Sequence, residues 1–120
     1  MAGMRDLPEL SAEDKKLVTL ARATRARIGA AEGAAVRDSD GRTYAAATVD
    51  LPSLQLTAAQ ACVAMAVASG SAGIDAVVVL GESGALADAD RAVLGEFSGA
   101  GGVVAHVGDP RGSIAATIAV

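Results

Sequence analysis

Few side chains in this sequence could do chemistry, and the clearest are Cys62, Asp90 and His106. They could offer a thiolate, a carboxylate and an imidazole to a zinc ion, which takes three or four converging protein ligands. The three lie in separate predicted elements, so the fold would have to bring them together. Two of them also have a plainer interpretation. Cys62 would be a small buried hydrophobe, and His106 would be a strand residue between valines.

Acidic residues gather where a helix is predicted to begin, at Asp88 and Asp90. Carboxylates in a first helical turn meet the positive end of the helix dipole and accept hydrogen bonds from free N–H groups. We therefore predict that they cap or flank this helix. The alternative is a polar pocket for a small cation or the amine of a nucleoside. Gln60 would donate to that pocket, or else bond a backbone carbonyl.

The composition describes a small protein that is rich in alanine. Of the 120 residues, 52% are apolar, and the aromatic ones are Tyr44 and Phe97. One cysteine permits no internal disulfide, which suits the reducing cytoplasm. No apolar stretch of the kind found in a secretory signal follows Met1. Small residues let helices and sheets approach closely, which is compatible with a large hydrophobic subunit interface.

Charge and apolar patterning argue against two classes of partner. Residues 1–31 hold six basic and four acidic side chains, whereas residues 32–120 hold four basic and ten acidic ones. An acidic body with few aromatic stacking platforms argues against nucleic-acid binding. The apolar stretch 58–80 is interrupted by serine, glycine and aspartate between 69 and 75. A membrane-spanning helix needs about 20 apolar residues without such breaks.

Hydrophobic periodicity predicts the elements that must position these side chains. Ser11 caps a first helix that ends at Gly29–Gly33. Lys15, Arg22 and Arg25 lie off its apolar stripe, as a solvated face or alternatively an anion-binding one. The other predicted elements are a β-hairpin of strands 34–37 and 43–49, a helix from 56 or 57 to 70, a buried strand 76–80, a helix 86–98, a strand 103–107 and a last strand 114–120.

This order of elements predicts an α/β fold in which helices enclose a mixed sheet of about five strands. The two strand–helix–strand crossovers require parallel pairing, and the hairpin adds an antiparallel edge. Residues 1–10 are predicted to be a mobile N-terminal tail. Residues 11–120 are predicted to form a single domain, as expected for this length.

Three segments then resemble the small zinc-dependent cytidine deaminases, over about residues 33–108. Family members show a G-A-A-L strand and a D-G-R turn, where this sequence has Gly33–Val36 and Asp40–Arg42. Family members next show an N-V-E-N segment, which corresponds to residues 48–51 of this sequence, and an S-Y-G-L-T segment, which corresponds to residues 53–57. The most specific match is R-Q-V-L-x-E-F, which keeps register with residues 91–97. The resemblance implies a three-layer α-β-α cytidine deaminase-like fold.

The chemistry of that family needs residues that this sequence lacks. Members hold a zinc ion with three Cys or His ligands, the zinc activates a water, and a glutamate moves the proton. Here the first ligand position is Ala59 and the glutamate position is Ala61. The two cysteines of P-C-x-x-C fall on Ala87 and Asp90. The resemblance therefore implies a degenerate member without catalytic residues or a zinc cofactor.

Two residues remain as candidate ligand-binding positions. Within the N-V-E-N segment, which holds the ribose and base in the family, Asp50 keeps the acidic character. Gln60 lies between the degenerate positions on the second helix. A register shifted by one residue places Gln60 on the glutamate and Ala58 on the ligand position, which still supplies neither a zinc ligand nor a general acid or base.

Three functions are consistent with these observations. The first is a catalytically inactive cytidine deaminase-like protein with a structural or regulatory role through homo-oligomer or partner contacts. The resemblance implies an oligomer, with a tetramer as the first expectation. The second is a nucleoside-binding module without chemistry. The third is a cytidine deaminase, a hydrolase, that uses an unrecognised metal site.

Overall fold

The computed structural model describes residues 9–120. The predicted mobile tail, residues 1–10, therefore lies almost entirely outside the described part of the chain. The first described element, α1 (Ala12–Ile28), begins as predicted, since the Ser11 side chain accepts a hydrogen bond from the Asp14 N–H at 3.1 Å. It ends at Gly29, whose φ of 73° is the left-handed conformation that glycine adopts without strain.

A mixed five-stranded sheet with the order β2-β1-β5-β6-β7 forms the centre of the molecule. Its strands are β1 (Gly33–Asp38), β2 (Thr43–Ala47), β5 (Ile74–Leu80), β6 (Val104–Gly108) and β7 (Ile114–Ala119). The pair β5–β6 is parallel, and the pairs β1–β2, β1–β5 and β6–β7 are antiparallel. This arrangement confirms the predicted α/β class and the predicted hairpin.

The prediction of parallel pairing is right for the β5–β6 crossover. Strands β2 and β5 also run in the same direction, but the predicted pairing between them is wrong. Strand β1 lies between β2 and β5 and pairs antiparallel with both. The physical reason is burial. The first four residues of β1 are buried, whereas most of β2 is only partly buried, so β1 takes the inner position of the hairpin.

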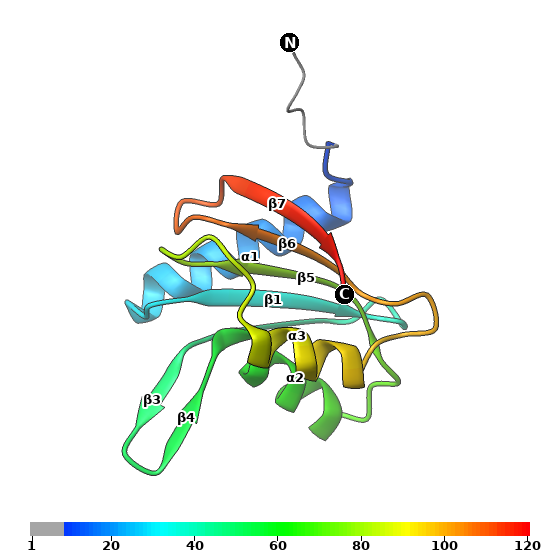
Figure 1. Ribbon diagram of the computed structural model, residues 1–120, viewed down its shortest axis with the longest axis horizontal. Coiled ribbons are helices and arrows are strands. Elements are labelled where there is room, and N and C mark those ends of the chain that lie inside the picture. Colours follow the sequence, from blue (N-terminus) through cyan, green and yellow to red (C-terminus); the bar gives the residue numbers. More distant parts are fainter. Residues whose placement is uncertain (1–8) are drawn as a thin grey trace.

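A second hairpin, β3 (Val49–Leu51) and β4 (Leu54–Leu56), was not among the predicted elements. The sequence predicts residues 48–49 as the end of the β2 strand and the residues around Pro52 as an irregular entry to the next helix. Each strand has three residues, too few for the alternating pattern that marks a strand. Figure 1 shows that this hairpin projects away from the body of the molecule. A two-stranded hairpin is marginally stable in water without further packing.

Helices cover both faces of the sheet (Figure 1). Helix α1 packs on one face against Ala35, Val78 and Leu80, and α2 (Ala58–Ala68) packs on the other against Val36 and Val79. Alternate residues of β1 and β5 therefore face opposite helical layers, as the two-residue period of a strand requires. Helix α3 (Asp88–Glu96), shorter than the predicted 86–98, joins α2 on its face. No helix within residues 9–120 is long and apolar enough to cross a membrane.

Candidate functional site

A cavity of about 560 Å³ opens beside the N-terminus of α2. This volume falls in the range of about 300–1,000 Å³ that small-molecule sites occupy. Its wall comes from the end of α1, the loop before β1, the β3–β4 hairpin, the first turn of α2 and the loop after β5. The lining residues are Arg25, Ala31, Glu32, Thr48, Val49, Asp50, Gln55, Leu56, Thr57, Gln60, Glu82 and Ser83.

Thr57 organises the first turn of α2. Its Oγ1 accepts a hydrogen bond from the Gln60 N–H, and the Gln60 Oε1 accepts one from the Thr57 N–H, each at 3.0 Å. This reciprocal pair is a capping box, which satisfies two backbone donors that a helix leaves free. The Thr57 Oγ1 also donates to the Asp90 Oδ1 at 2.5 Å, so α2 and α3 are joined at their N-termini.

Both candidate ligand-binding residues, Asp50 and Gln60, line this cavity. Asp50 is exposed on β3, and its Oδ1 accepts a 3.3 Å hydrogen bond from Gln55 on β4. The Gln60 side-chain oxygen is engaged by the Thr57 backbone N–H, and not through a donated bond to a backbone carbonyl as the alternative supposed. The Gln60 amide nitrogen therefore remains as the group that could donate to a ligand.

The degenerate positions carry almost no polar atoms. Ala59 and Ala61 are buried in α2, with 0% and 7% of their surface exposed. Ala87 is the N-cap residue of α3, where its methyl group offers no hydrogen-bond acceptor. Asp90 is 1% exposed, with its carboxylate held by Thr57. Of the two predicted helix-start carboxylates, Asp88 is exposed on the first turn of α3, whereas Asp90 turns inward to α2.

The donors at the two helix N-termini do not fit the zinc ion of the family. Three of the four positions that the resemblance assigns to the chemistry are alanine, and alanine cannot bind a metal. No group of three His, Cys, Asp or Glu side chains that could hold a metal occurs among residues 9–120. No step of a reaction can therefore be derived through zinc for these residues.

Cys62, Asp90 and His106 are not brought together, so the alternative metal site that they suggested is wrong. The Cys62 Sγ is buried in the core on the α2 side and donates to the Tyr44 carbonyl at 3.6 Å. Burial raises the pKa of this thiol to about 12, so it is protonated at neutral pH. Asp90 bonds Thr57, and His106 contacts α1 on the opposite face of the sheet.

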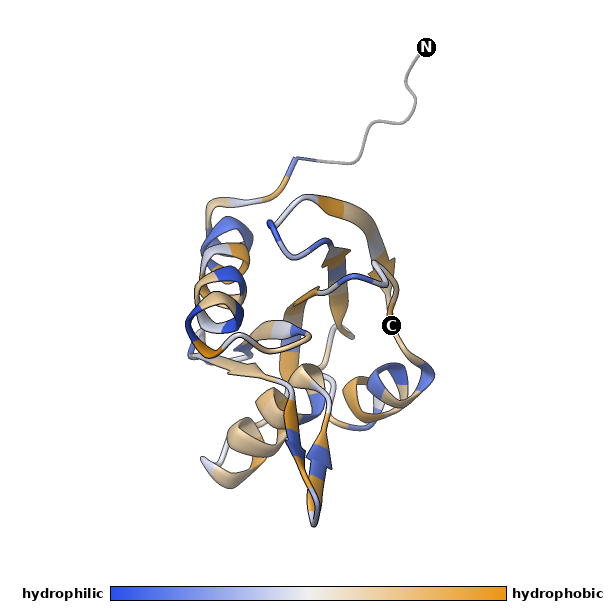
Figure 2. Cartoon of the chain, turned by 90° about the vertical axis from the view of Figure 1, so that its left-hand side faces the viewer, coloured by the Kyte–Doolittle hydropathy of each residue, from blue (hydrophilic) through white to orange (hydrophobic). Residues whose placement is uncertain are grey.

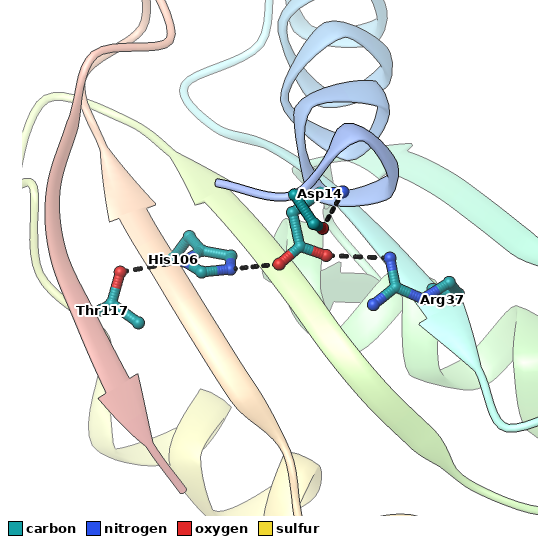
Figure 3. Close-up of polar contacts among 5 residues, drawn as sticks. Asp14, Arg37, His106 and Thr117 are labelled. Carbon is teal, nitrogen blue, oxygen red and sulfur yellow. Dashed lines mark hydrogen bonds and ion pairs between the residues drawn. The ribbon is translucent and has the colours of Figure 1, made fainter. Parts of the chain in front are cut away.

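His106 belongs to a separate polar cluster that joins α1 to the sheet (Figure 3). Its Nε2 lies 2.8 Å from the Asp14 Oδ2, and its Nδ1 lies 2.9 Å from the Thr117 Oγ1 on β7. Arg37 on β1 donates to the other Asp14 oxygen at 2.8 Å. Burial raises the pKa of Asp14, but the hydrogen bonds and positive charges of His106 and Arg37 together lower it below its ordinary value.

Glu32 is a cavity residue that sequence reasoning missed. Its backbone N–H donates to the Thr48 Oγ1 at 3.0 Å, and its carbonyl accepts from the Thr48 N–H at 3.1 Å. Burial raises the pKa of its carboxyl, and the charge of Asp90 raises it further, while a hydrogen bond from the Ala58 N–H offsets part of the rise. No motif marks this residue, and its one signal is the adjacent Gly33, where the chain passes close to α1.

A comparison with protein families identifies the class of protein to which this fold belongs. A family described as cytidine deaminase-like matches residues 10–112. The protein therefore belongs to the cytidine deaminase-like family. Among curated protein sequences, none matches this chain significantly.

Solved structures of cytidine deaminases share the fold. The enzyme from Burkholderia pseudomallei aligns with a TM-score of 0.76 at 22% identity, covering 92% of this chain and 93% of that one. The enzyme from Mycobacterium leprae aligns with a TM-score of 0.66 at 23% identity, covering 87% and 94%. The enzyme from Mycobacterium tuberculosis aligns with a TM-score of 0.66 at 24% identity, covering 79% of this chain and 85% of that one. At these identities the likeness concerns the fold, and it confirms the predicted architecture.

Proposed function

We propose that this protein is a catalytically inactive member of its family, with a structural or regulatory role exercised through contacts with its own copies or with a partner. One observation carries the proposal. Alanine occupies the first ligand position, the proton-transfer position and one cysteine position, and the remaining carboxylate, Asp90, is engaged by Thr57. A methyl group can neither coordinate a metal nor accept a proton.

The test is cytidine turnover by the purified wild-type chain. A matched gain-of-function variant, Ala59→Cys, Ala61→Glu, Ala87→Cys and Asp90→Cys, serves as the comparison. The wild type is expected to release no ammonia above the uncatalysed rate, with or without added zinc. Turnover by the wild type would support the third hypothesis, a hydrolase with an unrecognised metal site, and would overturn the proposal.

Self-association is the contact that the surface supports best. Helix α2 contains no charged residue, and apart from Gln60 in its first turn its residues are apolar (Figure 2), yet Met65 and Val67 are 38% and 53% exposed. A helix that is apolar all round is ordinarily buried. A hollow of about 630 Å³ runs beside it. Its lining combines five alanines of β2 and α2 with the apolar Ile28, Val49, Leu51, Leu56 and Met65 and the polar or charged Thr24, Arg27, Thr48 and Asp50. A homo-oligomer, with a tetramer as its expected size, would cover this face.

Sedimentation equilibrium of the full chain tests this part of the proposal. A mass that is a multiple of 11.7 kDa and that holds across a hundredfold dilution is expected. A monomer at all concentrations would contradict it.

Small-molecule binding without chemistry is the second candidate function. The observation in its favour is that Asp50 and Gln60, chosen as ligand-binding residues from the sequence, line the same cavity. Nucleosides are the first ligands to test, by titrating cytidine into the isotope-labelled chain and following amide shifts. Saturable shifts confined to the cavity wall, reduced by Asp50→Asn, would support this function, whereas unchanged spectra would argue against it.

A further inference from the structure

Arg25 is a cation without an ionic partner at the wall of the cavity. Within residues 9–120 its Nε is buried and has no hydrogen-bond partner. The ion pairs of Lys15 and Arg37, and the contact of His106 with Asp14, do not include Arg25. A guanidinium that is partly removed from water without an acceptor carries an uncompensated desolvation cost.

Close packing of α1 on β1 fixes Arg25 at this place. A Cβ at Gly33 would lie 2.6 Å from the Arg25 Cβ and would overlap the Ala21 carbonyl oxygen. Glycine at position 33 therefore lets the last turns of α1 lie directly against the start of β1. The arginine stem is held there by main-chain packing and not by a salt bridge.

Three carboxylates line the same cavity, from Glu32, Asp50 and Glu82. Glu32 is positioned by Thr48, and its side chain lies over Gly81, where an added Cβ would come within 3.0 Å of the Glu32 Cγ. Asp50 is oriented by Gln55 across the hairpin. The carboxylates that line the cavity therefore come from three separate segments of the chain.

This distribution of charge in the cavity favours a ligand that carries both a positive and a negative group. A simple anion would pair with Arg25 but would be repelled by the three carboxylates that line the same cavity. A simple cation would satisfy the carboxylates and leave the guanidinium without an acceptor. A molecule with one group of each sign satisfies both sides, because charge-assisted hydrogen bonds are the stronger kind.

We propose that the cavity binds a zwitterionic small molecule whose carboxylate pairs with Arg25 and whose ammonium group faces Glu32 and Asp50. The inference rests on the proposed small-molecule binding and names the chemical class of the ligand. Gln60 supplies a neutral donor nitrogen at the same wall. The ligand is thus of the amino acid or short peptide class, and not a neutral nucleoside.

The probes are ω-amino acids of increasing length: γ-aminobutyrate, δ-aminovalerate and ε-aminocaproate. Caproate and hexylamine each carry one of the two charges and serve as matched single-charge probes. Amide shifts of the full-length labelled chain report binding. At least one ω-amino acid is expected to bind about tenfold or more tightly than both single-charge probes, since each charged hydrogen bond contributes at least that factor.

Three variants test whether Arg25 and Glu32 cause the preference for ω-amino acids over the single-charge probes. Arg25→Gln is expected to remove the advantage of the amino acid over hexylamine, and Glu32→Gln the advantage over caproate. Arg22→Gln, an exposed arginine of the same helix outside the cavity, is expected to change neither. Thermal unfolding verifies that each variant folds. If Arg25→Gln does not fold, Glu32→Gln alone decides the outcome.

Several results would overturn the inference. These are equal binding of a single-charge probe, wild-type binding by Arg25→Gln, or no binding by any ω-amino acid. A parallel cytidine titration separates the two levels of the argument. Saturable cytidine binding without ω-amino acid binding would leave the small-molecule function in place and remove this inference. If neither cytidine nor any ω-amino acid binds, both the small-molecule function and this inference are wrong.

Discussion

At the scale of single residues, Thr57 connects the two helix ends where the family resemblance places the chemistry. It caps α2 through its hydroxyl and backbone, and it donates the same hydroxyl proton to Asp90. Without that donor, a carboxylate with 1% of its surface exposed would lose its hydrogen bond in the interior. The hydroxyl therefore stabilises the fold at a position where a catalytic relative would place reactive groups.

Thr57→Ala is expected to lower the free energy of unfolding by about 2–3 kcal/mol, since it removes an N-cap and leaves a buried carboxylate without its donor. Thr57→Ser keeps the hydroxyl and is expected to cost less than about 1 kcal/mol. Urea unfolding followed by circular dichroism measures both. Equal stability of the two variants would show that the bond to Asp90 contributes little.

Cys62 gives a second prediction at this scale. Its pKa of about 12 and its burial predict that the native thiol reacts negligibly with a disulfide reagent at pH 8. The same thiol is expected to react within seconds once the chain is unfolded in urea. Rapid reaction of the native protein would mean that α2 opens readily or that the thiol is accessible.

At the scale of elements, the polar cluster of Asp14, His106 and Arg37 holds the first turn of α1 against the sheet. The folded-state pKa of Asp14 is lowered from its ordinary value of 3.8, so its ionised form stabilises the fold. That contribution is fully present above the unfolded pKa and is lost as the pH falls through the lower folded value.

Asp14→Asn is expected to lower the free energy of unfolding by roughly 1–2 kcal/mol at pH 7, and by progressively less as the pH falls below 3.8, because the unfolded chain then binds a proton that the folded carboxyl, with its lowered pKa, does not yet bind. Urea unfolding of both proteins at a series of pH values measures the difference. A difference that stays constant as the pH falls from 7 through 3.8 and below would contradict the assigned role of this carboxylate.

The elements also show what the sequence could and could not predict. Long periodic segments such as α1 and the valine run of β5 were predictable, because their burial patterns repeat. The β3–β4 hairpin was too short to leave a pattern, and the inner place of β1 depends on which hairpin strand is more buried. Asp50 and Gln60 could be chosen from the family resemblance. Glu32 and Arg25 could not be placed, because tertiary packing around Gly33 and Gly81 puts them at the cavity.

At the scale of the whole molecule, the apolar face of α2 and the projecting β3–β4 hairpin both lack the packing that such elements ordinarily have. Leu51 and Leu54, at the hairpin tip, are 55% and 50% exposed. Association of several copies would remove both surfaces from water. On this proposal, the function lies in the surface of such an assembly and not in the degenerate site.

The variant Met65→Glu with Val67→Glu is expected to reduce the proposed oligomer to smaller species, because burying two new charges at an interface is strongly unfavourable. Both side chains are exposed in the single chain, so the fold itself should persist. Light scattering coupled to gel filtration measures the mass, and circular dichroism checks the fold. Lys16→Glu, on an exposed part of α1, is the control for added negative charge. An unchanged mass would exclude this face as the interface.

The most direct test of the central claim is the zinc content of the purified, untagged chain, measured by elemental analysis and expressed per subunit. The account predicts essentially no zinc, even after incubation with the metal and removal of the excess, because alanine occupies two of the three ligand positions and Asp90, at the third, is bound by Thr57. About one tightly held zinc per chain would contradict it, and would direct the search to a ligand set that this fold assembles in another way.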